Sequence, residues 1–174
     1  MIVEIRPLKL GDKSKLLQLI DAFRKSLAEL RGSEQKTDLR AASQELDEYQ
    51  RKNYPIYVAE DETGGLVGYL VCRVEGDVIW AESLYVVPEQ RRMGIGSALY
   101  AEAEHLAEQL GCDTVYNWID PNNNTIIQFL GKRGYNVLNL VELRRTYPGE
   151  GKMESISVGL NQFYRHGDRK SDKP

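Results

Sequence analysis

A short basic and glycine-rich turn is the part of this sequence best suited to chemistry. Residues 91–97 read Arg-Arg-Met-Gly-Ile-Gly-Ser. They follow a strand-like segment that ends at Val87, and their last three residues begin a helical segment at Ile95. Glycines remove the side chains that would keep an anion away from the backbone, and the N–H groups at a helix N-terminus attract negative charge. Arg91 and Arg92 add positive charge. The pattern indicates a site for a phosphate or pyrophosphate group.

Alternative roles for this turn can be tested on the same residues. Gly94 and Gly96 could simply permit a tight connection between a strand and a helix. A P-loop requires Gly-Lys followed by Ser or Thr, whereas Gly96 is followed by Ser97 and Ala98. A Rossmann fingerprint requires a third glycine where Leu99 stands. The turn therefore fits neither of these two nucleotide-binding motifs.

The turn lies within a series of strands and helices. A strand, a helix and a second strand follow one another between Val78 and Ile119, so these two strands should be parallel, whereas the earlier strands form an antiparallel meander. We expect a mixed sheet with helices on both faces, in the α/β class and of the α+β type. Helical spacing predicts helices at 12–32, 38–52, 95–110 and 125–132. Alternation predicts strands at 1–5, 56–59, 66–72, 78–87, 114–119 and 135–144, with a last strand or hairpin in 156–164 around Gly159.

Length and composition suit one ordinary domain. The chain has 174 residues, of which 41% are hydrophobic and 28% charged. We expect a single domain over residues 1–165 and a disordered polar tail over 166–174. The formal charge is −3 and there is no long basic run, which argues against a nucleic-acid partner.

Cysteine usage and hydropathy set further expectations. Cys72 and Cys112 are the only cysteines, and neither has the spacing of a metal site, so we expect reduced thiols and no bound metal. No apolar run reaches membrane length, and the N-terminal residues do not form a signal peptide. We therefore expect no membrane association and a cytoplasmic protein.

The segment from Val86 to Gly96 resembles the acetyl-CoA motif of the GNAT superfamily of acetyltransferases. It reads Val-x-Pro-x-x-Arg-x-x-Gly-Ile-Gly, against the family signature R/Q-x-x-G-x-G/A. Upstream, Ile5-Arg6-Pro7 followed by Asp12 and an amphipathic helix is similar to the start of many members. Downstream, Asn123 to Tyr135 is similar to the family segment N-x-x-A-x-x-F-Y-x-K-x-G-F, so the resemblance extends from residue 2 to about 145.

The resemblance implies an N-acetyltransferase that transfers an acetyl group from acetyl-CoA to an amine. It also implies a splayed central sheet, in which the pantetheine arm lies between the separated strands and pairs with them like an extra strand. The N–H near Val86 would then face the thioester carbonyl. By itself, Asn123 could equally be a loop residue that caps the next helix. The residues that would bind acetyl-CoA are Val86, Val87, Arg91, Arg92, Met93, Gly94, Ile95, Gly96, Ser97 and Asn123.

Glu82 is the candidate catalytic base. An amine of the lysine type has a pKa of about 10.4 and must lose a proton before it can attack a thioester. Glu82 stands where many members of the family place a carboxylate for this purpose, and strand alternation would put it on one face with Leu84 and Val86. The alternative is a strand glutamate that is merely exposed or ion-paired.

The general acid is missing from its expected position. Many members of the family protonate the leaving thiolate with a tyrosine where this sequence has Leu130. Tyr85, Tyr116 and Tyr135 are expected to be packing residues. A thiol pKa of about 8.5 makes CoA thiolate an acceptable leaving group without an acid.

Three points stay open in the sequence. The amine acceptor can be a peptide N-terminus, a lysine, a polyamine or a small amine. The protein can instead be a CoA-binding sensor or interaction module without activity, or, less in keeping with the motif, a nucleotide-phosphate binder. The segment from Met153 to Tyr164 is apolar enough to cover a strand edge, so we expect it to form a homodimer contact.

Overall fold

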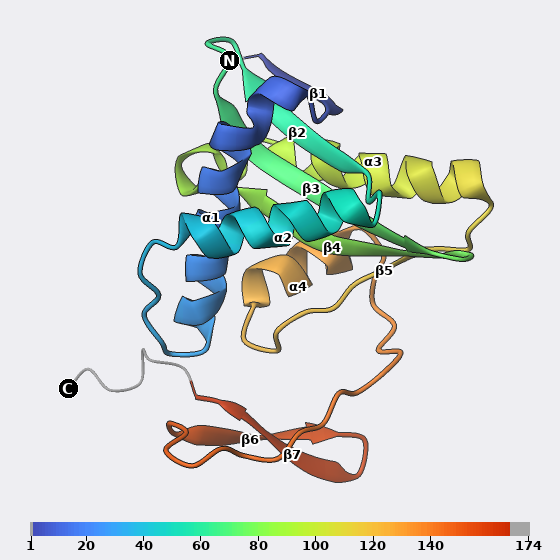
Figure 1. The fold of residues 1–174 in the computed structure, drawn as a ribbon. Coiled ribbons are helices and arrows are strands. Elements are labelled where there is room, and N and C mark those ends of the chain that lie inside the picture. The colour runs from blue at the N-terminus through green and yellow to red at the C-terminus, as the bar shows by residue number, and fades with distance from the viewer. Residues whose placement is uncertain (1, 168–174) are drawn as a thin grey trace. The chain divides into compact units, whose positions relative to one another are not determined.

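The computed structural model describes residues 2–167, and the chain divides into two compact units. The first unit comprises residues 1–25 and 36–118, and the second comprises residues 26–35 and 119–174. The main sheet belongs to the first unit, whereas the last helix and a separate hairpin belong to the second (Figure 1).

The main sheet has five strands in the order β1-β2-β3-β4-β5. Neighbouring strands are antiparallel except for β4 and β5, which are parallel, as predicted. Helix α3 (Ile95–Leu110) carries the chain back between these two strands, which is the connection that parallel pairing requires. The strands are β1 (Val3–Pro7), β2 (Ile56–Asp61), β3 (Leu66–Glu75), β4 (Val78–Val86) and β5 (Val115–Tyr116).

Helices cover both faces of the main sheet, as predicted (Figure 1). Helices α1 (Lys13–Leu30) and α2 (Leu39–Arg51) lie on one face, and α3 lies on the other. The apolar positions at helical spacing turn toward the sheet and form a core with its side chains. The residues buried in this core include Leu16, Leu19, Ile20, Ala42, Leu46, Tyr49, Val58, Tyr69, Val71 and Tyr85.

Helix α3 approaches the sheet closely at Gly68 of β3. A Cβ atom on this glycine would lie 2.8 Å from the carbonyl oxygen of Tyr85 and 3.1 Å from Cδ1 of Leu99. These distances are shorter than a normal carbon contact, so only glycine fits. Gly68 pairs with Val86, the last residue of β4. Its missing side chain thus lets α3 pack directly against the end of the strand that leads into the glycine turn.

A buried ion-pair network joins β1 to the start of α1. The Arg6 guanidinium donates to both oxygens of Asp12, at 2.7 and 3.0 Å, and to Glu60 at 2.5 Å. Asp12 also accepts the backbone N–H of Lys9 at 2.8 Å. Because it faces this guanidinium and accepts these bonds, the pKa of Asp12 is lowered to about 2.

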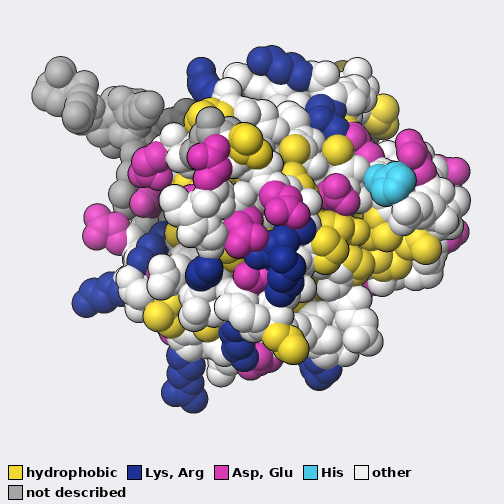
Figure 2. All heavy atoms as spheres, turned by 90° about the horizontal axis from the view of Figure 1, so that it is seen from above, with side chains coloured by type: hydrophobic (Ala, Val, Ile, Leu, Met, Phe, Trp, Pro, Cys, Tyr) yellow, Lys and Arg dark blue, Asp and Glu magenta, His cyan; other side chains and the backbone are white. Residues whose placement is uncertain are grey.

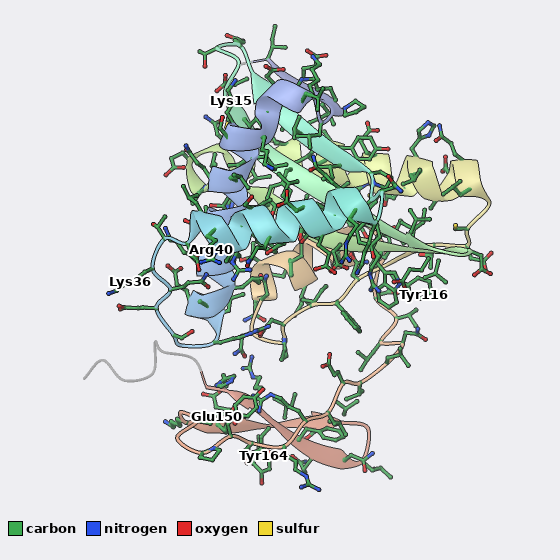
Figure 3. The ribbon with its side chains drawn as sticks, in the orientation of Figure 1. Lys15, Lys36, Arg40, Tyr116, Glu150 and Tyr164 are labelled. Atoms are coloured by element: carbon green, nitrogen blue, oxygen red, sulfur yellow. The ribbon has the colours of Figure 1, made fainter. Side chains whose placement is uncertain are left out.

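The second unit contains α4 (Asn124–Lys132) and a hairpin of β6 (Met153–Val158) and β7 (Asn161–His166). The predicted hairpin around Gly159 is confirmed, and Gly159 has the positive φ of 60° that the turn needs. Tyr164 of β7, labelled in Figure 3, is 69% exposed. β7 includes His166, the first residue of the expected tail, and residues 168–174 lie outside the described residues.

The predicted strand over residues 135–144 is wrong. This stretch has no regular secondary structure, and its neighbouring apolar residues Val137 and Leu138 are 85% and 70% exposed. The predicted strand at 114–119 is present but shorter, because only Val115 and Tyr116 pair with β4. Alternation indicates that a segment can form a strand, whereas a strand also needs a backbone partner along its length.

The surface and the helices bear on possible partners. Lys and Arg side chains are mixed with Asp and Glu over the face shown in Figure 2, and no extended area of one sign is visible on that face. Among the helices of residues 2–167, none is long and apolar enough to cross a membrane.

Candidate active site at the glycine turn and strand β4

The glycine turn connects β4 to α3 through a short 3-10 helix, Pro88–Gln90. The chain then passes through Arg92 and Gly94, whose φ angles are +63° and +86°. A positive φ suits glycine but is uncommon for arginine, so the backbone at Arg92 is held in an unfavourable conformation. No residue pattern in the sequence indicates this strain. Gly94 is the N-cap of α3, which begins at Ile95 as predicted.

The N-terminus of α3 is open toward an incoming group. Gly94 provides no side chain to cap the helix, and a Cβ atom built on it would meet nothing within 4 Å. The N–H groups of the first helical turn, which include Ile95, Gly96 and Ser97, have no acceptor within the helix. Arg91 and Arg92 are exposed beside them. Backbone donors, helix dipole and arginines therefore fit an anionic group such as a pyrophosphate.

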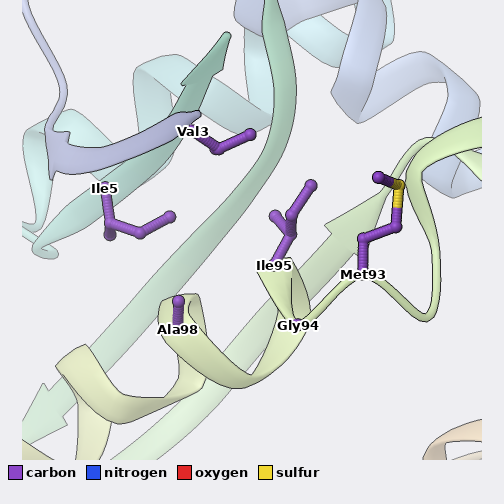
Figure 4. Close-up of a pocket in the computed structure, with 6 residues that line it drawn as sticks. All are labelled: Val3, Ile5, Met93, Gly94, Ile95 and Ala98. Carbon is purple, nitrogen blue, oxygen red and sulfur yellow. The ribbon is translucent and has the colours of Figure 1, made fainter. Parts of the chain in front are cut away.

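A hollow of about 260 Å³ lies against this turn (Figure 4). The side chains of Val3 and Ile5 from β1 point into it from one side, and those of Met93 and Ile95 from the other. Gly94 and Ala98 complete its lining, which is mostly apolar. This hollow can take an uncharged part of a ligand whose charged part lies on the turn.

Arg91 folds back onto the strand that precedes it. Its Nε donates to the carbonyl oxygen of Val86 at 2.9 Å, and its guanidinium lies 5.5 Å from the ring centre of Tyr85. The backbone N–H of Val87 donates to Val67 at 2.9 Å, so it belongs to the sheet. Arg91 and Val87 are thus held in position around the end of β4.

Strand β4 has an edge that β5 leaves unpaired. The parallel pairing joins only Ile79 to Val115 and Trp80 to Tyr116, so the rest of β4, up to Val86, runs on without β5 beside it. The separation of the two strands after Trp80 produces the splay. Backbone amide and carbonyl groups along such an edge can pair with the amides of an extended ligand.

A β-bulge places Glu82. Val71 of β3 pairs with Ser83 and the next residue, Cys72, pairs with Ala81, so Glu82 is an extra residue with no partner in β3. The expected alternation of Glu82 with Leu84 and Val86 is therefore wrong. The side chain of Val86 lies near Gly68 and Leu99 on the α3 face, whereas Glu82 contacts Arg73 on the opposite face.

The Glu82 carboxylate is partly exposed and held by an arginine. Its side chain is 32% exposed, and its Oε2 accepts a hydrogen bond from Nε of Arg73 at 2.8 Å. The other oxygen, Oε1, has no hydrogen-bond partner among the described residues. The sequence identified Glu82 but not Arg73, because the two come together only through the pairing of β3 with β4.

A second feature missed by the sequence is a buried hydroxyl chain beside Glu82. Ser83 lies 3.1 Å from the Tyr49 hydroxyl, which donates to Glu45 at 2.6 Å. Burial and the nearby Glu45 carboxylate raise the pKa of Tyr49 well above its ordinary value. Tyr49 therefore stays protonated. Its contact with Ser83 holds the residue that follows Glu82 in the bulge.

Two candidate residues lie in the second unit. The side chain of Asn123 accepts the N–H of Ile126 at 3.2 Å, so Asn123 caps α4. Its neighbour Asn122 is buried and accepts from Arg165 at 2.9 Å. Leu130, which stands at the position of the family tyrosine, is 3% exposed. The tyrosines named in the sequence differ in their settings: Tyr85 is in the core, Tyr116 contacts Trp80, and Tyr135 is half-buried.

Comparison with known proteins identifies the family. The model of the acetyltransferase (GNAT) family matches residues 18–135, which is more than half of the chain. The protein therefore belongs to the GNAT acetyltransferase family.

Solved structures with low sequence identity share its fold. AAC(6')-Iy, in complex with the bisubstrate analogue CoA-S-monomethyl-acetylneamine, has a TM-score of 0.63 and 18% identity, over 85% of this chain and 100% of that one. The PaiA N-acetyltransferase of Thermoplasma acidophilum, in complex with coenzyme A, has a TM-score of 0.64 and 20% identity, over 76% of this chain and 89% of that one. A Trypanosoma brucei acetyltransferase has a TM-score of 0.60 and 21% identity, over 84% of this chain and 100% of that one. The mixed, splayed sheet with helices on both faces is thus the GNAT fold.

Proposed function

We propose that this protein is an acetyl-CoA-dependent N-acetyltransferase that acts on an amine by direct transfer. The observation that carries the proposal is the open N-terminus of α3, which follows a splayed β4 inside the segment that matches the family. The pyrophosphate would lie on Arg91, Arg92, Met93, Gly94, Ile95, Gly96 and Ser97. Structural neighbours with CoA or a CoA analogue bound support this use of the fold.

The unpaired edge of β4 would hold the pantetheine arm. This arm carries two amides, and the backbone of β4 up to Val86 offers partners that β5 does not take. Val87 would contact the arm through other atoms, because its N–H donates to Val67. The N–H of Val86 would donate to the thioester carbonyl and stabilise the negative charge that develops there. When bound, acetyl-CoA supplies an activated acetyl group, and the chain supplies position and charge.

Glu82 would take the proton of the amine. The amine nitrogen attacks the thioester carbonyl carbon, an N–C bond forms, and the C–S bond breaks with its electron pair on sulfur. Glu82 removes the excess proton of the amine, directly or through water. Because Glu82 is the bulged residue, it has no pairing partner in β3. The thiolate leaves and takes a proton from water, because Leu130 has none to donate.

The remaining assignments complete the proposal. Asn123 would contact the CoA arm in addition to capping α4. The two units would belong to one domain over residues 1–165, since the family match runs through both of them. No metal would take part, and the cytoplasm is the proposed compartment.

A second copy of the chain is proposed as a further partner. Within the second unit, large apolar side chains are exposed both in the irregular stretch 135–147 and on the hairpin. A two-stranded hairpin alone is marginally stable in water, and exposed apolar side chains favour association. A homodimer would cover these residues. The most exposed are Val137, Leu138, Leu140, Leu143, Tyr147, Leu160 and Tyr164.

The test of the pyrophosphate site is the substitution Gly96→Glu, with Ala101→Glu as its matched control. A carboxylate in the first turn of α3 stabilises the helix, so the variant should fold, yet it would repel the pyrophosphate. Ala101 is exposed on the same helix and adds the same charge one turn further on.

Isothermal titration with acetyl-CoA should show affinity lost in Gly96→Glu and kept in Ala101→Glu. Equal affinity in both folded variants would show that the site is misplaced. A screen of amine classes for CoA release then separates an enzyme from an inactive CoA-binding module, and competition by ATP would reveal a nucleotide site.

A further inference from the structure

Three aromatic side chains gather where the start of β4 pairs with β5, on the side of Arg73. The ring centres of Trp80 and Tyr116 are 5.3 Å apart, and those of Trp80 and Trp118 are 5.5 Å apart. Figure 3 labels Tyr116 at this end of the sheet. Trp118 is 68% exposed, although it is one of the largest apolar side chains in the chain. The three rings are called here the aromatic shelf. Trp80 and Tyr116 are half-buried, so the exposed part of this apolar surface is mainly Trp118.

Arg73 packs its guanidinium against two rings of the aromatic shelf. Its guanidinium carbon lies 4.8 Å from the ring centre of Trp80 and 5.4 Å from that of Trp118. The side chain of Arg73 is only 15% exposed, and its Nη2 is buried without a hydrogen-bond partner among the described residues. Contact with two indoles stabilises this cation. The contacts with Arg73 therefore fix the positions of the Trp80 and Trp118 rings.

The same arginine connects the shelf to the proposed catalytic base. Its Nε donates to Glu82 at 2.8 Å, and its Nη1 lies 3.1 Å from Glu75. Two carboxylates and one guanidinium leave this cluster with a net charge of −1. A positively charged amine is attracted to such a cluster, and an apolar or aromatic group a few bonds away from the nitrogen can lie on the shelf.

We propose that the aromatic shelf of Trp80, Tyr116 and Trp118 is the acceptor subsite, and that it selects primary amines carrying an aromatic or flat apolar group near the amine. This inference rests on the proposed acetyltransferase function and names its substrate class. Trp118 is the specificity-determining residue, because it exposes the largest free area. Arg73 is a positioning residue that fixes both the shelf and Glu82.

Two amines that differ only in a phenyl group provide the turnover test. The ratio of kcat/KM for 2-phenylethylamine to kcat/KM for ethylamine should be high in the unmodified protein and about tenfold lower in Trp118→Ala, in keeping with the contribution of one aromatic contact. Trp118→Phe should restore most of the ratio. The control Leu10→Ala removes a fully exposed apolar side chain from the same unit and should leave the ratio unchanged.

Tryptophan fluorescence provides a test that does not need turnover. The chain contains two tryptophans, Trp80 and Trp118, and both belong to the shelf. Titration with 2-phenylethylamine should change the emission saturably, and the same concentrations of ethylamine should not. Trp118→Phe retains Trp80 as the reporter, and should still show saturable binding.

The two measurements separate the possible failures. Saturable binding of 2-phenylethylamine without CoA release from any amine would overturn the proposed function and leave the subsite in place. CoA release with the same amine preference in Trp118→Ala as in the unmodified protein would overturn the subsite. A change in mass by light scattering in Trp118→Ala, without a change in preference, would also overturn it and would assign the shelf to contact with a second copy.

Discussion

Removing the negative charge of Asp12 tests the buried network that anchors α1 to the sheet. In the fold the pKa of Asp12 is about 2, below its ordinary value of 3.8, because Arg6 and the Lys9 N–H favour the ionised carboxylate. One pKa unit corresponds to about 1.4 kcal/mol, so the ionised form contributes about 2 kcal/mol to folding. Asp12→Asn should lower the free energy of unfolding at pH 7 by about this amount.

The sign of the pH dependence follows from the lowered pKa. The contribution of Asp12 is complete above about pH 4 and is lost as the pH falls toward 2, because the unfolded chain then binds the proton more readily. Urea unfolding at several pH values should show the difference between Asp12→Asn and the unmodified protein shrinking over this range.

The matched control is Asp47→Asn. Asp47 pairs with Lys13 at 3.1 Å, but both side chains are more than half exposed. Such a surface pair contributes about 0.5 kcal/mol or less. Equal losses in Asp12→Asn and Asp47→Asn, or a loss in Asp12→Asn that does not change between pH 5 and pH 2, would refute the reasoning.

Two further predictions concern packing and assembly. Gly68→Ala should lower the free energy of unfolding by about 1–3 kcal/mol, because its Cβ would press on the Tyr85 carbonyl oxygen, whereas Gly11→Ala, where a Cβ meets nothing within 4 Å, should change it by about 0.5 kcal/mol or less. Urea unfolding of both variants measures this, and equal effects would contradict the packing argument. A chain that ends after Thr146 lacks the hairpin of β6 and β7 and should lose the proposed dimer in light scattering, if the hairpin provides the main contact. A full-length chain that is already monomeric would rule the dimer out.

Local patterns in the sequence were enough to predict most of the first unit. Helical spacing located α1, α2 and α3 to within about two residues, and the glycines at 94 and 111 marked both ends of α3. The order of strand, helix and strand predicted the single parallel pair. These features depend on residues close together in the chain, and so a single sequence contains them.

Features that depend on pairing between strands could not be predicted. The bulge at Glu82 reverses the face on which this carboxylate lies, and it arises from the register of β4 against β3. The contact of Arg73 with Glu82 and Trp80 follows from the same register. The stretch 135–144 alternates like a strand but has no partner in the described residues, which alternation alone does not reveal.

The pH dependence of amine acetylation in Glu82→Gln tests the central proposal most directly. With an amine that the screen identifies, kcat/KM for CoA release should fall by about 100-fold or more near pH 7 and recover partly near pH 10, where the amine is already deprotonated. Glu75→Gln is the control, because Glu75 also pairs with Arg73, and it should lose less than tenfold. Glu82→Gln with the activity and pH profile of the unmodified protein, or a loss matched by Glu75→Gln, would contradict the assignment of Glu82 as the base of an N-acetyltransferase.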